Sequence, residues 1–517
     1  MAILLPQFPQ LFRISGSEFM LSFDQSSSFR YQCRVALCLA FSFAAIFLLS
    51  HVNQAQVLTA RVSLQPVGQT PKATIVGRCS KATTKWSFLD NYGRILGLAD
   101  RISNLKLTDA SDRELAVKKT GPGEFLSSQP AVNFSYDLDL SAPQNPADAA
   151  HVSWISFQRG FLMLGDLLPN QSAEPTRVSF GLPPKWQVLS SATRKGDGSY
   201  EVVDQAKAVF FVGSDLREKH KRIGNQDASF VSSGEWSFPI ARVMDNIGKI
   251  MRDHASTTGL DLSGAITVML APYPGSTNRS GWSAEARGGN VILLASPDSP
   301  LSSGQLAVIM CHELFHLWMP NAVNFDGDFD WFFEGFTLYH ALGTALRLKL
   351  IDFQEFLATL GRVYDSYQSS ADRGKFSLIE FSRRRWTVGS SFVYDQGMLT
   401  AFLFDLKLRK STNNQKLSDD LFRTLFSRYH GSTKQVDGND ILISMMAELT
   451  GREFVKDYVQ TAVDIKLETL LPEYGMRLDS IGGRHRLEVA EPLSPEQQRL
   501  LSDLGYRKAR ARAAFIN

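Results

Sequence analysis

Residues from about Gln56 to Ser232 alternate between hydrophobic and polar positions in short runs. In the clearest run, AVNFSYDLDL, every second residue from Val132 to Leu140 is apolar. A period of two is typical of a β-strand with one buried face. Pro, Gly, Asn and Asp separate this run from similar runs on either side,. The pattern predicts a β-rich N-terminal domain, most simply a β-sandwich.

The hydrophobic period changes near Gly234. Apolar residues at helical spacing run from Ile240 to Met251, and two strand-like apolar runs follow at 265–272 and 290–297,. Later segments are nearly all helical, and the chain ends in basic residues,. These changes predict a multidomain α+β protein. Its expected parts are a leader over 1–55, a β-rich domain over 56–232, a catalytic domain over 233–351, a helical domain over 352–475 and a tail over 476–517.

The N-terminal segment has the composition of an export signal. Residues 35–50 carry no charge, follow Arg30 and Arg34, and precede small and polar residues at Asn53 to Ala55,. The stretch is long for the core of a signal peptide and short for a spanning helix. We therefore expect a cleaved signal peptide or a membrane anchor formed by residues 35–50. In both cases the folded part is exported: periplasmic, secreted, or anchored and facing outside.

Composition excludes several classes of protein. The chain has 517 residues, of which 44% are hydrophobic and 21% charged. That describes a folded chain too long for one hydrophobic core, and it excludes a disordered protein. The 55 basic and 52 acidic residues leave a net charge of +3. Such a balance predicts no nucleic-acid partner.

The sequence Cys311–His316 contains the pattern HExxH. His312 and His316 lie four residues apart in a predicted helix that ends near Pro320,. On a helix they lie on one face, one turn apart, and can bind one Zn²⁺ ion together. Glu313 lies beside them and is the expected general base.

A zinc site of this type needs a third protein ligand and leaves one position open. Glu334, in WFFEGF, opens an apolar helix downstream of His316. A carboxylate among aromatic residues is costly to bury unless it is paired or bound to a metal. We predict that Glu334 is this ligand; the alternative is a helix-start acid favoured by the helix dipole.

On the segments HELFHLW and WFFEGFTLY, the chain resembles the gluzincin metallopeptidases. Among these it is most similar to the glycyl aminopeptidase family, with the aminopeptidase N family second. The resemblance implies a thermolysin-like zinc catalytic domain behind the β-rich domain and ahead of the helical region. It extends more weakly over about residues 80–470.

The resemblance implies two further site residues. Glu285, in GWSAE, matches a carboxylate that faces the substrate's free amino group in this family, although Ala286 stands where relatives carry His or Asn. Tyr394, in VYDQG, resembles a tyrosine that donates a hydrogen bond to the oxyanion, with Gln396 in place of the family's Lys,. The alternatives are an exposed loop acid for Glu285 and a core tyrosine for Tyr394.

These features predict a zinc-dependent aminopeptidase that acts on peptide substrates. The resemblance implies that it removes small N-terminal residues such as Gly or Ala. Two alternatives remain open. The same zinc site could serve an endopeptidase or an aminopeptidase of broader specificity, or the chain could be a non-catalytic surface binding protein.

Overall fold

The computed structural model describes residues 57–65, 70–170, 175–275, 282–298, 304–323, 325–385, 390–432 and 435–507. All of these residues fall in one compact unit, Val57–Asn517. The predicted leader and the apolar stretch 35–50 lie outside the described residues, so the signal peptide and the anchor stay predictions. Within the described part of the chain, no helix is both long and apolar enough to cross a membrane.

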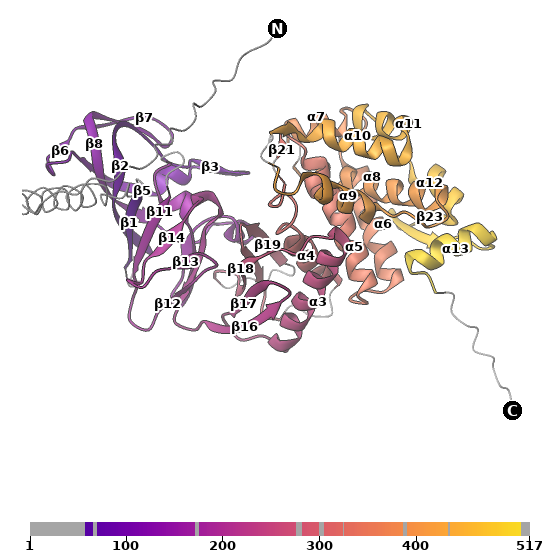
Figure 1. The fold of residues 1–517 in the computed structure, drawn as a ribbon, viewed down its shortest axis with the longest axis horizontal. Coiled ribbons are helices and arrows are strands. Elements are labelled where there is room, and N and C mark those ends of the chain that lie inside the picture. The colour runs from indigo at the N-terminus through magenta and orange to yellow at the C-terminus, as the bar shows by residue number, and fades with distance from the viewer. Residues whose placement is uncertain are drawn as a thin grey trace, which may run out of the picture. The chain divides into compact units, whose positions relative to one another are not determined.

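Most of the N-terminal strands join one nine-stranded sheet (Figure 1). Eight strands follow the order β13-β14-β11-β1-β2-β8-β5-β6, and β7 pairs with β8 outside this row. The strands are β1 (Leu58–Leu64), β2 (Lys72–Ser87), β5 (Ile102–Thr108), β6 (Glu114–Leu115), β7 (Val117–Gly121), β8 (Glu124–Asp139), β11 (Thr176–Gly181), β13 (Thr193–Arg194) and β14 (Tyr200–Val202). The alternating run of the sequence lies on β8, where Phe134, Tyr136 and Leu138 are buried as predicted.

A smaller sheet of four strands has the order β12-β15-β10-β9. Its strands are β9 (Trp154–Ile155), β10 (Arg159–Met163), β12 (Gln187–Leu189) and β15 (Val209–Gly213). Side chains of this sheet and of the nine-stranded sheet share one buried cluster, which includes Ile75, Tyr136 and Phe210. The predicted β-rich N-terminal region therefore contains two sheets with a common core.

The third large sheet has five strands in the order β16-β17-β18-β20-β19. They are β16 (Arg217–Ile223), β17 (Gln226–Ser232), β18 (Gly264–Pro272), β19 (Trp282–Arg287) and β20 (Asn290–Ala295). The three central strands are parallel, and the two edge strands are antiparallel to their neighbours. Because β17 pairs with β18, this sheet runs across the boundary that the sequence suggested after residue 232.

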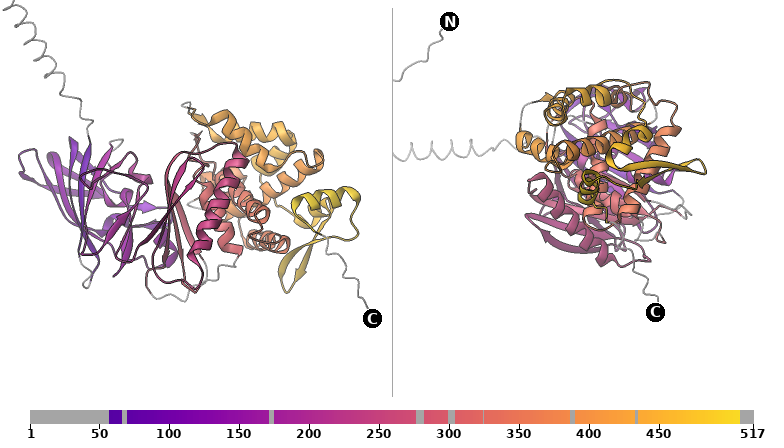
Figure 2. Two further views of the ribbon diagram at one scale, coloured as in Figure 1. Left: turned by 60° about the horizontal axis from the view of Figure 1, so that its bottom comes forward. Right: turned by 90° about the vertical axis from the view of Figure 1, so that its right-hand side faces the viewer.

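Helices form most of the chain after the five-stranded sheet (Figure 2). The α-helices are α2 (Leu164–Leu167), α3 (Ile240–Thr258), α4 (Gly304–Phe315), α5 (Thr337–Arg347), α6 (Phe353–Ser369), α7 (Leu378–Arg383), α8 (Ser390–Ser411), α9 (Ser418–Tyr429), α10 (Gly438–Thr450), α11 (Arg452–Val455), α12 (Leu467–Leu470) and α13 (Pro495–Leu504). The 3-10 and π turns are η1 (Leu98–Arg101), η2 (Pro146–Ala150), η3 (Gln205–Lys207), η4 (Trp331–Phe336), η5 (Lys456–Gln460) and η6 (Leu471–Tyr474). The remaining strands pair as β3 (Asn91–Tyr92) with β4 (Ile95–Leu96), β21 (Phe325–Asp326) with β22 (Val436–Asp437), and β23 (Met476–Ile481) with β24 (Arg484–Val489).

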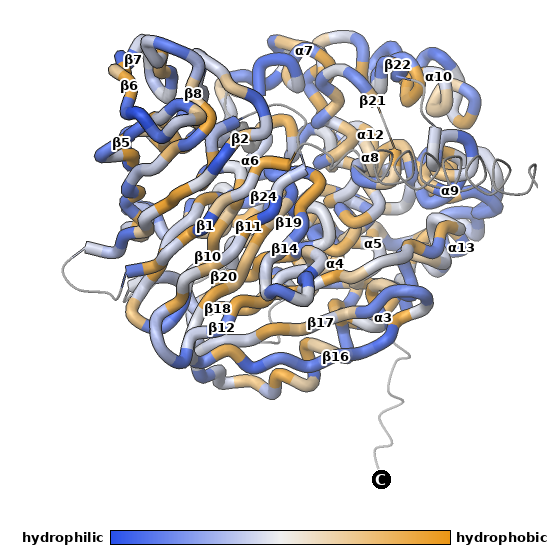
Figure 3. Tube along the Cα trace, turned by 60° about the vertical axis from the view of Figure 1, so that its left-hand side comes forward, coloured by the Kyte–Doolittle hydropathy of each residue, from blue (hydrophilic) through white to orange (hydrophobic). Residues whose placement is uncertain are grey.

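Two further buried clusters place the five-stranded sheet between β-structure and helices. One cluster joins Phe211 of the four-stranded sheet to Met269 and Ile292 of the five-stranded sheet. The other packs the opposite face of that sheet against the helices. Apolar residues follow the inner strands in Figure 3, whereas the edge strand β16 is mostly hydrophilic and exposed.

The segment after residue 475 is more than a tail as far as it is described. It forms the β23–β24 hairpin and helix α13. Met476, Leu487 and Leu501 from these elements are buried in the same cluster as the helices. The mixture of sheets and helices confirms the predicted α+β class.

Candidate metal centre and active site

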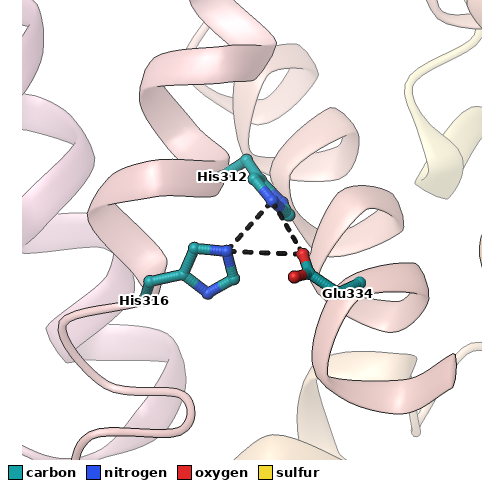
Figure 4. Close-up of side chains that lie close together, drawn as sticks. All are labelled: His312, His316 and Glu334. Atoms are coloured by element: carbon teal, nitrogen blue, oxygen red, sulfur yellow. Dashed lines mark hydrogen bonds and ion pairs between the residues drawn. The ribbon is translucent and has the colours of Figure 1, made fainter. Parts of the chain in front are cut away.

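The HExxH motif lies on α4 and on the turn that follows it. Leu306, Met310 and Leu314 bury the helix in the core. The backbone N–H of His316 still donates to the carbonyl of His312, at 3.3 Å, although α4 ends at Phe315. The two imidazoles therefore keep helical spacing and face the same side of the helix (Figure 4).

Glu334 comes from the π-helical turn η4, which continues directly into α5. Turns of this kind are frequent at functional sites. The backbone N–H of Trp331 donates to Ser382 Oγ at 2.9 Å, and its indole N–H donates to Asn439 Oδ1 at 2.8 Å. These bonds hold the start of the turn. Glu334 is only 6% exposed, so its carboxylate is turned into the protein.

Three potential ligand atoms, one from each residue, lie close together, as Figure 4 shows. His312 Nε2 lies 3.0 Å from His316 Nε2, and Glu334 Oε2 lies 3.3 Å from the first and 3.6 Å from the second. A tetrahedral ion with bonds of about 2.1 Å holds its ligand atoms roughly 3.4 Å apart. Two imidazole nitrogens and one carboxylate oxygen are also a donor set that Zn²⁺ accepts with one position left open. The residues therefore fit the ion that the sequence predicts.

Hydrogen bonds outside the triad orient its members. His316 Nδ1 lies 2.9 Å from the carbonyl oxygen of Met319 and donates to it, which leaves Nε2 free to face the triad,. Burial alone would raise the pKa of Glu334. Its contacts with His312 and His316 outweigh burial and hold that pKa well below the ordinary value, so the carboxylate is charged.

Glu313 lies beside the triad and is partly buried. Burial raises the pKa of Glu313 to about 7, with help from the Glu285 and Glu334 carboxylates and against the opposing effect of His316. A carboxyl group with this pKa exchanges protons near neutral pH. Its position next to the predicted metal ligands suits the role that the motif implies.

Arg385 was not identified from the sequence, and it connects three groups of the site. Its guanidinium donates to Asp330 and to the Tyr394 oxygen, and its Nη2 lies 3.3 Å from Glu334 Oε1. Tyr394, on α8, is therefore close to the triad. Burial and the Glu334 charge raise the pKa of Tyr394 well above its ordinary value, so the phenol keeps its proton. Because Arg385 donates to the phenol oxygen, the phenol O–H acts as a donor, and its hydrogen bond with Glu334 also raises the pKa of Tyr394.

Two glycines allow α8 to approach η4. A Cβ atom on Gly335 would lie 2.5 Å from the Cα atom of Gly397, and one on Gly397 would lie 2.5 Å from the carbonyl oxygen of Trp331. No side chain fits between the two backbones. This contact sets the separation between the elements that carry Glu334 and Tyr394.

Glu285 lies on the edge strand β19, which packs against α4. It is surrounded by donors: the Tyr92 hydroxyl and His151 Nδ1 both bond its carboxylate, and Arg287 Nε donates to Oε1 at 3.0 Å. Tyr92 and His151 come from the β-rich region. No pattern in the sequence pointed to them, because they lie 193 and 134 residues before Glu285.

A chain of hydrogen bonds begins at the backbone carbonyl of Cys311 on α4. His254 Nε2 donates to the carbonyl of Cys311 at 2.9 Å, and His254 Nδ1 lies 3.2 Å from His340 Nε2. His340 Nδ1 bonds Asp419 Oδ1 at 2.9 Å. This buried chain ties α4 to α3, α5 and α9 and so supports the helix that carries the motif.

No protein-family model matches the sequence, and no curated protein matches it. Solved structures do match. An aminopeptidase N family protein from Idiomarina loihiensis is similar with a TM-score of 0.70 and 17% identity, over 82% of this chain and 79% of that chain. A mutant M1 zinc metallopeptidase from Deinococcus radiodurans, bound to a Tyr-Ser-Ala substrate, is similar with a TM-score of 0.51 and 13% identity, over 80% of this chain and 95% of that chain. The chain has the M1 metallopeptidase fold.

At these identities the likeness establishes the fold alone. The M1 fold agrees with the second family that the sequence resembles, while the closer match to glycyl aminopeptidases stays a prediction. The structure brings His312, His316 and Glu334 together, and the metal-binding and catalytic roles of these residues and of Glu313 stay predictions. The roles of Glu285 and Tyr394 stay predictions.

Proposed function

We propose that the chain is a zinc-dependent metallopeptidase with a thermolysin-like catalytic domain. The convergence of His312, His316 and Glu334 on one point carries this proposal. These three residues would hold the ion. When bound, Zn²⁺ polarises a water molecule and the carbonyl of the bond to be cut.

The neighbouring side chains supply the proton transfers. Glu313 would take a proton from the attacking water and pass it to the leaving amine. Tyr394 would donate its hydroxyl hydrogen bond to the oxygen that becomes negative in the transition state. Arg385 would hold both Glu334 and Tyr394 in place, because it contacts both.

We further propose that the enzyme acts as an aminopeptidase. The resemblance assigns Glu285 to the substrate's amino group, and Gly and Ala to its preferred N-terminal residue. The M1 structure bound to Tyr-Ser-Ala supports a peptide as the class of substrate. The β-rich region brings Tyr92 and His151 to Glu285, at the position where the amino end of such a peptide would lie.

Hydrolysis of alanyl and glycyl chromogenic amides tests the proposal. We expect the zinc-loaded full chain to cleave them. Glu313→Gln should keep its zinc and lose about 10²–10⁴-fold in kcat, because it removes only the general base. His312→Ala should lose both zinc and activity. Equal activity of Glu313→Gln and the parent would refute the assigned mechanism.

One observation favours a second activity, cleavage of peptides that lack a free amino end. Glu285 already accepts bonds from Tyr92, His151 and Arg287. Its charge is therefore partly compensated before any substrate binds. Hydrolysis of N-acetylated peptides separates the two activities, because a strict aminopeptidase does not cleave them.

We also propose that the enzyme is exported and acts outside the cytoplasm. The uncharged stretch 35–50 behind Arg30 and Arg34 supports this location,. Cell fractionation of the full chain, with sequencing of the mature N-terminus, tests it. Cleavage near residue 55 would identify a signal peptide, an intact N-terminus in the membrane fraction would identify an anchor, and recovery from the cytoplasm would refute export.

A further inference from the structure

Glu285 lies in a compact polar cluster with three partners from two parts of the chain. Arg287, two residues further along β19, donates through Nε to Oε1 at 3.0 Å and through Nη2 to the backbone carbonyl of His151 at 2.7 Å. The Arg287 guanidinium also lies 4.1 Å from the centre of the Tyr92 ring. Tyr92 and His151 stack on one another and both bond the Glu285 carboxylate.

The charge of Glu285 is balanced inside this cluster. The side chain of Arg287 is only 6% exposed and that of Glu285 14% exposed, so the ion pair is poorly screened by water,. Burial would raise the pKa of Glu285, but the bonds from His151 and Arg287 reverse the effect and lower it to about 2. Glu285 is therefore ionised, and a permanent cation lies beside it.

The acceptor capacity of Glu285 is also largely used. A carboxylate offers about four lone-pair positions on two oxygens. Oε1 accepts from Tyr92 and Arg287, and Oε2 accepts from His151. A substrate ammonium group carries three donors. To bind Glu285 as an ion pair, it must displace His151 or share Oε2 with it.

The side chains of His151 and Glu285 differ in how far they are exposed to solvent. The His151 side chain is 32% exposed, more than twice as much as that of Glu285. His151 is therefore the more accessible of the two side chains to a molecule from solvent. The cluster borders the candidate active site, since β19 packs against α4.

We infer that substrate selection depends on three residues that compensate the negative charge of Glu285: Arg287, His151 and Tyr92. Because this charge is compensated, the enzyme binds peptides with an uncharged, acylated amino end about as well as peptides with a free ammonium group. The inference rests on the proposed peptidase function, because it takes this cluster to contact the amino end of a peptide. It assigns a specificity role to three residues that the HExxH chemistry does not use. His151 is the partner that a substrate ammonium must displace or with which it must share Oε2.

Peptide binding to the zinc-loaded Glu313→Gln protein tests the inference without turnover. The probes are Ala-Ala-Ala and N-acetyl-Ala-Ala-Ala, and calorimetry gives both dissociation constants. We expect the two constants to agree within about threefold. Adding His151→Ala should free an acceptor position on Oε2, so that the ratio shifts about tenfold toward the free peptide. Such a shift corresponds to about 1.4 kcal/mol.

Two further variants keep the test decisive. Tyr92→Phe removes one hydroxyl from Oε1 and should shift the ratio in the same direction by a smaller factor. His220→Ala is the matched histidine control, because His220 lies on β16, at the opposite edge of the same sheet, with its side chain 73% exposed. It should leave the ratio unchanged.

Three results would overturn the inference: a preference of more than about 100-fold for the free peptide before His151 is changed, an unaltered ratio in His151→Ala, or no binding of either peptide. Hydrolysis by the parent enzyme is scored separately. Failure to cut any peptide with zinc present refutes the proposed function. Cleavage of Ala-Ala-Ala together with an unaltered ratio refutes the inference alone.

Discussion

Arg385 shows how one residue can control both a predicted metal ligand and a predicted catalytic group. Its guanidinium is planar and can bond several oxygens in fixed directions. It contacts Oε1 of Glu334, while Oε2 of the same carboxylate faces the two histidines. It also donates to the Tyr394 oxygen. The orientations of the third ligand and of the phenol are therefore coupled through one side chain.

Arg385→Gln should weaken zinc binding without unfolding the protein. Loss of a residue that orients a ligand typically costs 10–100-fold in metal affinity, so we expect a loss in this range and a parallel loss of kcat. Competition with a chromogenic chelator measures the affinity. Arg384→Gln is the matched control, because the Arg384 guanidinium lies over the Phe376 ring instead of the site. Wild-type zinc affinity in Arg385→Gln would contradict this role.

Asp419 should make the stability of the fold depend on pH. Burial would raise its pKa, but His340 and Arg347 hold that pKa well below the ordinary 3.8. A carboxyl with a lowered folded-state pKa adds stability above its unfolded pKa, and this stability is lost as the pH falls toward the folded value. Asp419→Asn should therefore destabilise the protein by about 3 kcal/mol at pH 7 and by less near pH 3, where the unfolded chain has begun to bind the proton while Asp419 in the folded state is still charged. Urea unfolding at both pH values measures this, and an equal loss at both would contradict it.

Among the elements that carry the site, η4 and α8 cross so closely that neither glycine at the crossing leaves room for a side chain. The backbones meet at Gly335 and Gly397, where a Cβ atom would lie 2.5 Å from backbone atoms. Neither backbone can move without moving Glu334 or Tyr394. The π-helical form of η4 and this close crossing together set the geometry of the site.

Gly335→Ala should force the two elements apart. We expect it to destabilise the protein by about 1–3 kcal/mol or more, the usual cost of overpacking, and to lower kcat as well. Gly343→Ala on α5 is the control, because a Cβ atom there meets nothing within 4 Å. That variant should be neutral or up to about 1 kcal/mol more stable, since alanine favours a helix over glycine. Thermal unfolding and amide hydrolysis measure both effects, and equal behaviour of the two variants would contradict the steric argument.

Local patterns predicted the elements that carry the site, but not their partners. The period of β8 and the spacing of His312 and His316 are properties of short segments, and the structure contains both. Tyr92, His151 and Arg385 reach the site through tertiary contacts that no local period encodes. The pairing of β17 with β18 was not predicted for the same reason. The alternation of apolar and polar residues indicates a strand but does not show which other strand it pairs with. The π-helical turn at Glu334 packs against α8, and the apolar run of that segment reveals neither the turn nor the contact.

Across the unit Val57–Asn517, the five-stranded sheet is covered on both faces. One face packs on helices, and the other packs on the four-stranded sheet through a separate buried cluster. The β-rich region also supplies two of the three partners of Glu285. The β-rich region therefore buries one face of the sheet that supports α4. The same region also supplies Tyr92 and His151 to the Glu285 cluster.

A fragment of residues 233–507 should consequently fail to fold. It lacks β16 and β17, so β18 loses one of its two parallel neighbours. It also exposes the sheet face that contains Met269, Ile292 and Leu294. Each such side chain contributes about 1.5–3 kcal/mol when buried, so the loss approaches the 5–15 kcal/mol by which a typical folded domain is stable.

A fragment of residues 214–507 restores β16 and β17 but leaves that face uncovered, and it should bind a hydrophobic dye and unfold without a cooperative transition. Residues 57–517 should unfold cooperatively in the same assay. Native-like near-UV circular dichroism from the 233–507 fragment would show that the sheet does not need the β-rich region.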